Sequence, residues 1–218
     1  MTTEPVFPPS DDKLGQILET AQRRFGLYGY EKTTMQEIAG DLGISKPLLY
    51  YYFADKSKLF RAVVEKEQEE FLRVMDQRVH EQESPADMMF EFISVRIHYF
   101  RKFINLTKLR MDTFHSIKPI VHELHEEIKA KEVQLVREII ERGISQNQFD
   151  VDAPEATTFL FLDILQMLRW KLLHKRELLT LTEEDESQMR CMMNQFARIF
   201  IRGISHPAAQ PMSLSKSL

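Results

Sequence analysis

The chain has 218 residues, enough for one ordinary domain or for a small domain joined to a larger one. Its apolar fraction of 43% can build a hydrophobic core, which excludes disorder throughout, and its net charge of −4 argues against non-specific coating of nucleic acid. Glycine is scarce, at 7 residues, whereas Glu, Lys, Leu, Arg, Gln and Met abound. This composition favours helices over a turn-rich β architecture, so we expect an all-α fold.

Cysteine use and the lack of targeting signals indicate the compartment. Cys191 is the only cysteine, so no intrachain disulfide can form, which fits a reducing environment. Residues 1–10 lack the basic and apolar regions of a secretion signal, and no uncharged apolar run reaches the roughly 18 residues of a membrane helix. We expect a cytoplasmic protein that does not interact with a membrane.

The first helix is predicted over residues 12–27. Leu14, Leu18, Ala21 and Phe25 recur within it at steps of four, three and four residues, which places them on one side of the helix. This side is expected to face a core.

Two short helices are predicted next. Residues 34–37, Thr-Met-Gln-Glu, form a capping box that satisfies the first free backbone N–H groups, and Gly43 ends this helix after about two turns. Ser45 is a second N-cap, with Pro47 in the first turn of a helix that runs to about Phe53. Two short helices joined in this way are typical of a helix-turn-helix, whose second helix enters the major groove of DNA.

The segment from Thr33 to Lys56, TTMQEIAGDLGISKPLLYYYFADK, followed by SKLF, resembles the N-terminal signature of the TetR family of transcriptional regulators. The resemblance covers roughly residues 12–64, and the length and helix order of the remainder also suit that family. It implies a homodimer that binds double-stranded, palindromic operator DNA, most often as a repressor that a small-molecule effector releases. It implies neither catalysis nor a cofactor.

The resemblance also assigns DNA contacts to individual residues, which are Thr33, Thr34, Lys46, Pro47, Leu48, Tyr50, Tyr51, Tyr52 and Lys56. One of the two threonines and Lys56 would meet phosphates, and the others would form the recognition turn. The chemistry agrees, because lysine can donate to guanine, Pro and Leu can contact a thymine methyl group, and tyrosine hydroxyls suit phosphates. Leu48 is bulky where the family often has a small residue, and Tyr52 stands where histidine is common.

Helical geometry limits how the three tyrosines can point. At about 100° per residue Tyr50, Tyr51 and Tyr52 cannot all face inward, so at least one must face out while another packs against the domain. Leu49 and Phe53, four residues apart, are the better core pair. Residues 46–66 carry a local surplus of cations, which are Lys46, Lys56, Lys58, Arg61 and Lys66 against Asp55 and Glu65.

Helical signals continue along the rest of the chain. Further helices are predicted over residues 56–81, from 84 through 100, and over 106–115, 119–146, 152–174 and 182–203. We therefore expect a flexible arm over 1–10, a three-helix DNA-binding domain over 11–55, a larger effector-binding and dimerisation domain over 56–206, and a flexible tail over 207–218.

The larger domain is rich in aromatic and thioether side chains, which line ligand sites between helices but also fill cores. The effector candidates are Phe92, Phe100, Phe103, Met111, Phe114, Asp163, Met167 and Trp170, with Tyr99 nearby. Asp163 lies within the apolar run FLFLDILQML, which predicts a buried carboxylate that needs a partner. An effector, another subunit or a nearby arginine could supply it, and structural ion pairs are the commoner case.

Residues 159–173 are apolar on almost all sides, which indicates a helix covered on two faces. The last predicted helix carries Met189, Met192, Met193, Phe196, Ile199 and Phe200. The family resemblance implies that these two helices pair with their copies in a second subunit as a four-helix bundle.

Two other functions fit the sequence less well. A helical enzyme or metal protein would need a convergent set of acid, base, nucleophile or ligand groups, and none is visible. His122 and His125 stand one turn apart without a clear third ligand, so we predict a solvated face and no metal site. An architectural DNA-binding protein would need a broadly basic surface, which the charge balance lacks.

Overall fold

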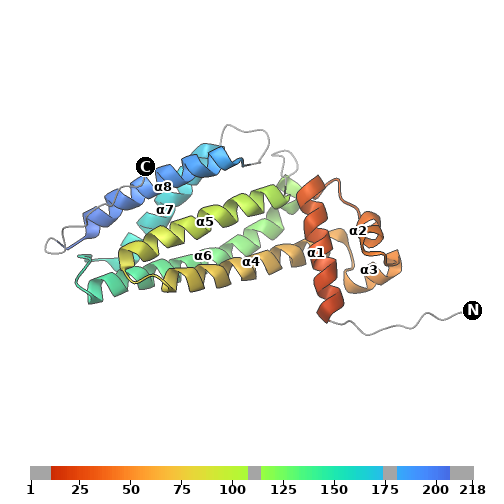
Figure 1. The fold of residues 1–218 in the computed structure, drawn as a ribbon, viewed down its shortest axis with the longest axis horizontal. Coiled ribbons are helices and arrows are strands. Elements are labelled where there is room, and N and C mark those ends of the chain that lie inside the picture. Colours follow the sequence, from red (N-terminus) through yellow and green to blue (C-terminus); the bar gives the residue numbers. More distant parts are fainter. Residues whose placement is uncertain (1–10, 108–113, 174–180, 207–218) are drawn as a thin grey trace, which may run out of the picture. The chain divides into compact units, whose positions relative to one another are not determined.

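The computed structural model describes residues 11–107, 114–173 and 181–206, with side chains placed except at 11, 103–125 and 172–180. Within these ranges the chain forms eight helices, labelled in Figure 1. They are α1 (Asp11–Tyr28), α2 (Met35–Leu42), α3 (Lys46–Tyr52), α4 (Lys56–His80), α5 (Pro85–Thr107), α6 (Phe114–Ser145), α7 (Pro154–Leu173) and α8 (Glu183–Ile204). The predicted all-α fold is confirmed.

The helices form two compact units that alternate along the chain. The first unit holds the described residues among 1–70 and 101–124, and the second unit holds those among 71–100, 125–176 and 181–218. Helices α4, α5 and α6 therefore contribute to both. The predicted arm and tail lie outside the described residues. None of the described helices combines the length and apolar character needed to cross a membrane.

Helix bounds agree with the capping signals, with one correction. Capping boxes precede α2 at Thr34 and α8 at Thr182, and Gly43 ends α2 in the left-handed conformation with φ of +63°. The helix predicted to begin at Pro119 begins instead at Phe114, so the proline lies within the helix. Most of the separate helix predicted over 106–115 lies outside the described residues or belongs to the ends of α5 and α6.

The first unit has its core between α1 and the start of α4. Ile17, Ala21 and Phe25 of α1 are buried, and the Phe25 ring meets the Phe60 ring edge-on with centroids 5.2 Å apart. The predicted core side was wrong at Leu14, which is exposed. Leu14 lies seven residues before Ala21 and therefore on the same side of the helix, but it is one turn nearer the start of α1 than Ile17, where the described residues leave it 37% exposed.

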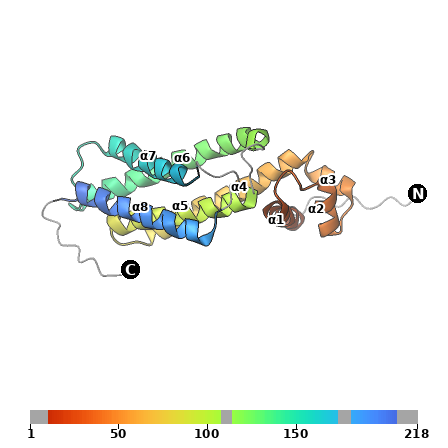
Figure 2. The ribbon, with the colours of Figure 1, turned by 90° about the horizontal axis from the view of Figure 1, so that it is seen from above.

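The second unit is centred on an aromatic cluster that joins α5, α7 and α8. Phe161 of α7 lies 6.4 Å from Phe92, 5.7 Å from Phe196 and 4.9 Å from Phe200, measured between ring centroids. Figures 1 and 2 show α7 and α8 packed together, and Arg190 of α8 donates to Ser94 Oγ of α5 at 2.9 Å. Burial of these large rings is the main apolar contribution that holds the three helices together.

Gly143 of α6 provides a stability test, because a Cβ added there would overlap the ring of Phe149. We expect Gly143→Ala to lower the free energy of unfolding by about 1–3 kcal/mol, since the buried ring must shift. Gly203→Ala in α8 meets open space and should be neutral or stabilising by up to about 1 kcal/mol. Urea unfolding followed by circular dichroism compares the two variants, and equal changes in their free energies of unfolding would contradict the close contact between Gly143 and Phe149.

Candidate nucleic-acid interface

The first unit exposes one side of α3. Leu49 is completely buried, whereas Lys46, Pro47, Leu48, Tyr50 and Tyr51 of the same helix are exposed, Tyr51 by 59%. Helix α3 begins at Ser45, whose hydroxyl accepts from the Leu48 backbone N–H at 3.4 Å. The single buried leucine fixes which side of this short helix faces away from the unit.

The three tyrosines divide as the helix geometry requires. Tyr50 and Tyr51 are exposed and Tyr52 is half-buried, with the Tyr51 and Tyr52 rings edge-on at 5.7 Å. The expectation that at least one faces out is confirmed. Phe53 is half-buried, so Leu49 is the stronger member of the predicted core pair. Lys46 Nζ lies 5.8 Å from the Tyr50 ring centroid, which places its charge beside the exposed ring.

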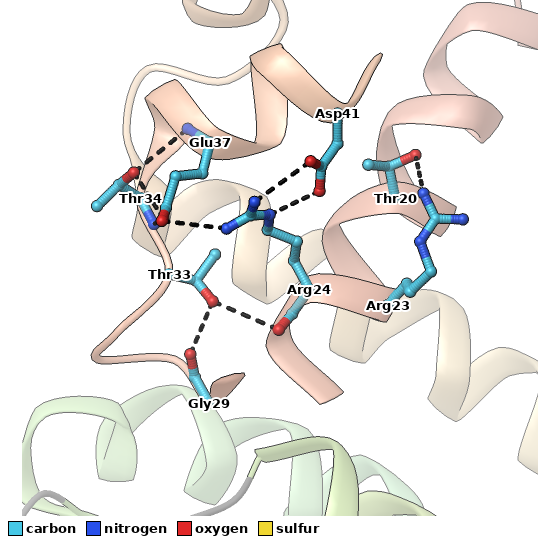
Figure 3. Close-up of polar contacts among 8 residues, drawn as sticks. All are labelled: Thr20, Arg23, Arg24, Gly29, Thr33, Thr34, Glu37 and Asp41. Atoms are coloured by element: carbon cyan, nitrogen blue, oxygen red, sulfur yellow. Dashed lines mark hydrogen bonds and ion pairs between the residues drawn. The ribbon is translucent and has the colours of Figure 1, made fainter. Parts of the chain in front are cut away.

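The two threonines have different positions, shown in Figure 3. Thr33 is completely buried, and its hydroxyl donates to the Gly29 carbonyl at 2.8 Å. Thr34 is exposed at the start of α2, where its Oγ1 accepts from the Glu37 backbone N–H at 3.3 Å and its hydroxyl donates to the Glu37 carboxylate. Of the pair, Thr34 alone lies where it can meet a phosphate.

Lys56 is engaged with the protein itself. Its Nζ donates to the carbonyls of Tyr30 and Glu31 at 2.9 and 3.4 Å, and it lies 4.3 Å from the Tyr30 ring centroid. These contacts tie the loop after α1 to the start of α4. Sequence reasoning assigned this lysine to a phosphate and missed its structural role, because the carbonyls lie about 25 residues away in the chain.

Helices α1 and α2 are joined by an ion-pair cluster around Arg24 (Figure 3). Its Nε and Nη2 donate to the two carboxylate oxygens of Asp41 at 2.6 and 3.2 Å, and its Nη1 lies 3.2 Å from Glu37. Hydrogen bonding to Asp41 raises the pKa of Arg24, and hydrogen bonds from Arg24 lower the pKa of Asp41. Hydrogen bonds from Thr34 are the largest cause that lowers the pKa of Glu37. This bidentate pair fixes α2 on α1.

The effector candidates do not form one cluster. Phe92 is buried and Phe100 is half-buried, whereas Met167 and Trp170 are exposed by 61% and 60%. The side chains of Phe103, Met111 and Phe114 lie outside those the structure describes, as do His122 and His125. Elsewhere in the described chain, no three potential metal ligands come together.

The prediction of a buried carboxylate at Asp163 was wrong, because Asp163 is exposed. The inward side of α7 carries Phe161, Leu162 and Leu165, and Asp163 stands about 200° round the helix from Phe161. It shares the outward side with Met167 and Trp170. The outward side of α7 is the second apolar face that the sequence predicts, and the described residues of this chain leave it uncovered.

A pocket in the second unit lies between α4 and α6. Its volume is about 140 Å³, and its lining includes Leu72, Met75, Glu132 and Leu135. Ligand pockets of drug size measure roughly 300–1,000 Å³. This pocket could take a small group and not a whole ligand of that size.

Residues 17–63 match the family model of bacterial regulatory proteins, tetR family. A transcriptional regulator from Cytophaga hutchinsonii, solved by crystallography, is 35% identical, with 89% of this chain and 99% of that chain covered and a TM-score of 0.81. The HTH-type transcriptional activator FasR of Mycolicibacterium smegmatis is 41% identical over 58 residues, or 27% of this chain and 26% of the relative.

An HTH-type transcriptional repressor of Mycobacterium tuberculosis is 30% identical over 94 residues, or 41% of this chain and 50% of the relative. The matches thus span between a quarter and a half of the length of these two curated relatives. With the helix-turn-helix in place and a structural relative similar over nearly its full length, the chain belongs to the TetR family of transcriptional regulators. The resemblance inferred from residues 33–60 is confirmed.

The Arg24 cluster makes stability depend on pH. Folding lowers the pKa of Asp41 and Glu37, so their contribution is fully present above the ordinary carboxyl pKa of about 4 and is lost as the pH falls through the folded values. We expect Arg24→Gln to lower the free energy of unfolding at pH 7 and the deficit to shrink as the pH falls below about 4. Urea unfolding of both proteins at several pH values measures this difference in the free energy of unfolding.

Arg23→Gln is the matched control, since the exposed Arg23 guanidinium donates to Thr20 Oγ1 at 3.5 Å and is the smallest of the causes that lower the pKa of Asp41. Its deficit should be small throughout. An Arg24→Gln deficit that is the same at neutral and acid pH would contradict the role given to the carboxylates.

Proposed function

We propose that the chain is a ligand-responsive repressor that binds a palindromic operator as a dimer and leaves the DNA when a mostly apolar small molecule binds. The single observation that carries DNA recognition is the exposed side of α3, which presents a lysine and two tyrosines above a buried leucine. In this proposal residues 11–55 bind DNA, and residues 56–206 bind the effector and dimerise. The protein acts in the cytoplasm, where operator DNA is found.

Helix α3 is proposed to enter the major groove. Lys46 suits guanine O6 and N7, Pro47 and Leu48 suit a thymine methyl group, and the hydroxyls of Tyr50 and Tyr51 suit phosphates. Thr34 begins α2, where free backbone N–H groups also favour a phosphate. Thr33 and Lys56 support this surface from within, by the contacts described above.

Dimerisation is proposed through α7 and α8. Their exposed large apolar side chains are Phe159, Leu160, Met167, Trp170 and Ile199. Large apolar surface of this kind, left uncovered by its own chain, is typical of a protein interface. A two-fold dimer through these helices would present two copies of α3 to operator half-sites one or more helical turns apart.

The effector is proposed to bind among the helices of residues 84–173. Aromatic rings are concentrated there, with Phe92 and Phe100 on α5, and the short DNA-binding domain of residues 11–55 is too small to enclose a ligand of its own. Binding would change the separation of the two α3 helices. Linkage then requires that DNA weakens effector binding by the same factor by which the effector weakens DNA binding.

Substitutions in α3 test DNA recognition. Wild-type protein is first used to select its preferred duplex from a randomised DNA pool. Lys46→Ala should weaken binding to that duplex by about 1–3 kcal/mol, the cost of one lost base contact, and Tyr51→Ala should weaken it through a lost phosphate contact, both without changing helix content. Lys129→Ala, an exposed lysine of α6, is the control. Fluorescence anisotropy titration measures the affinities, and unchanged affinity in both α3 variants would contradict the assignment of α3 as the recognition helix.

A charge on the outward side of α7 tests the dimer. Trp170→Glu should give monomers at micromolar concentration with an intact helical fold, because Trp170 is exposed in the single chain and its charge would be desolvated only in a dimer. Gln134→Glu, an exposed position of α6, should leave the dimer intact. Sedimentation equilibrium measures both, and a dimeric Trp170→Glu protein would contradict the proposed interface.

A further inference from the structure

Three charged side chains from three helices meet inside the second unit. Arg96 of α5 and Glu132 of α6 form an ion pair with Nε and Oε1 2.7 Å apart, and their side chains are only 10% and 4% exposed. In the described part of the chain, the buried Arg96 Nε makes this ion-pair contact and no further hydrogen bond. Arg96 and Glu132 therefore neutralise each other, and any further cation beside them is in excess.

Arg169 of α7 brings a second cation to the same place. Arg169 is half-buried on the side of α7 that also carries Leu162 and Leu165, and its guanidinium carbon lies 4.6 Å from the ring centroid of Phe100. In the part of the chain that the structure describes, its one hydrogen bond goes to Gln166 Oε1 at 3.2 Å. Burial, and next the charge of Arg96, lower the pKa of Arg169 to about 10, and Glu132 offsets this only in part. The arginine is therefore still charged at pH 7.

The described residues of this cluster thus carry two positive charges and one negative charge. A desolvated charge without a counter-charge is unfavourable, and guanidinium groups pair best with a planar carboxylate through two parallel hydrogen bonds. We propose that Arg169, supported by Arg96, binds the carboxylate of a small organic acid inside the second unit. This inference rests on the proposed function, whose effector it defines as an apolar acid.

The surroundings favour one carboxylate on an apolar body. A single negative charge balances the excess of one, whereas a phosphate dianion would overbalance it. The rings of Phe100 and Phe92, which lie under the guanidinium groups of Arg169 and Arg96 at 4.6 and 6.0 Å, offer apolar surface beside the charges. The carboxylate of such a ligand accepts from the Arg169 guanidinium, and its hydrocarbon part is buried against the rings.

Binding of matched probes tests the charge requirement. Isothermal titration calorimetry of the full-length protein would use octanoate and 4-phenylbutyrate, each paired with its neutral amide. At least one acid should bind about tenfold more tightly than its amide, the size expected for a charge-assisted hydrogen bond, and Arg169→Gln should abolish this preference. Arg137→Gln, an exposed arginine of α6, should retain it. The proposal is overturned if neither acid is preferred or if the preference survives Arg169→Gln.

Thermal unfolding without any ligand gives an independent test. If Arg169 awaits a ligand, Arg169→Met should leave the melting temperature unchanged or raise it, because an uncompensated desolvated cation is removed. Glu132→Gln should lower it, because two cations then face each other. A marked fall for Arg169→Met would show a structural ion pair and overturn the proposal. Without acid, the Arg169→Gln variant should bind DNA with the same affinity as the wild-type protein. If the wild-type protein itself shows no specific DNA binding, that result contradicts the proposed function and not the carboxylate site.

Discussion

The surface proposed to read DNA depends on how a helix of seven residues is held in place. A helix this short is not stable by itself, so tertiary contacts must fix it. Burial of Leu49 sets which side of α3 faces outward, and the Ser45 cap sets where the helix begins. The Arg24 pairs with Asp41 and Glu37 hold α2 on α1, and α3 follows α2 through the left-handed turn at Gly43. The exposed tyrosines are thereby presented on a rigid support.

In the second unit, the two sides of helix α7 have different surroundings. The inward side of α7 places Phe161 in the aromatic core and Arg169 beside the Arg96–Glu132 pair. The outward side keeps Trp170 and Met167 exposed, together with Asp163. In the proposed dimer, α7 would link the effector to the partner subunit, because any ligand that moves its inward side also moves the outward one. That coupling is the physical basis for an allosteric response.

Local signals in the sequence predicted much of the fold, because they act over a few residues. The capping boxes at Thr34 and Thr182 and the turn at Gly43 are of this kind. Contacts distant in sequence could not be predicted: Arg24 meets Asp41 seventeen residues away, and Arg96 meets Glu132 on another helix. The apolar run around Asp163 led to the wrong prediction that this carboxylate is buried. Such a run indicates a buried helix but does not show which side of the helix faces the core. The family resemblance identified α3 but not that Thr33 and Lys56 serve the framework.

In the proposed dimer, two copies of α3 read DNA through successive major grooves. Mapping guanine N7 protection from dimethyl sulfate on the selected duplex tests it most directly, because N7 lies in the major groove. We expect two protected clusters related by two-fold symmetry, with centres about 10 base pairs apart or a multiple of that spacing. A single protected cluster, or none on a duplex that the protein binds tightly, would contradict it.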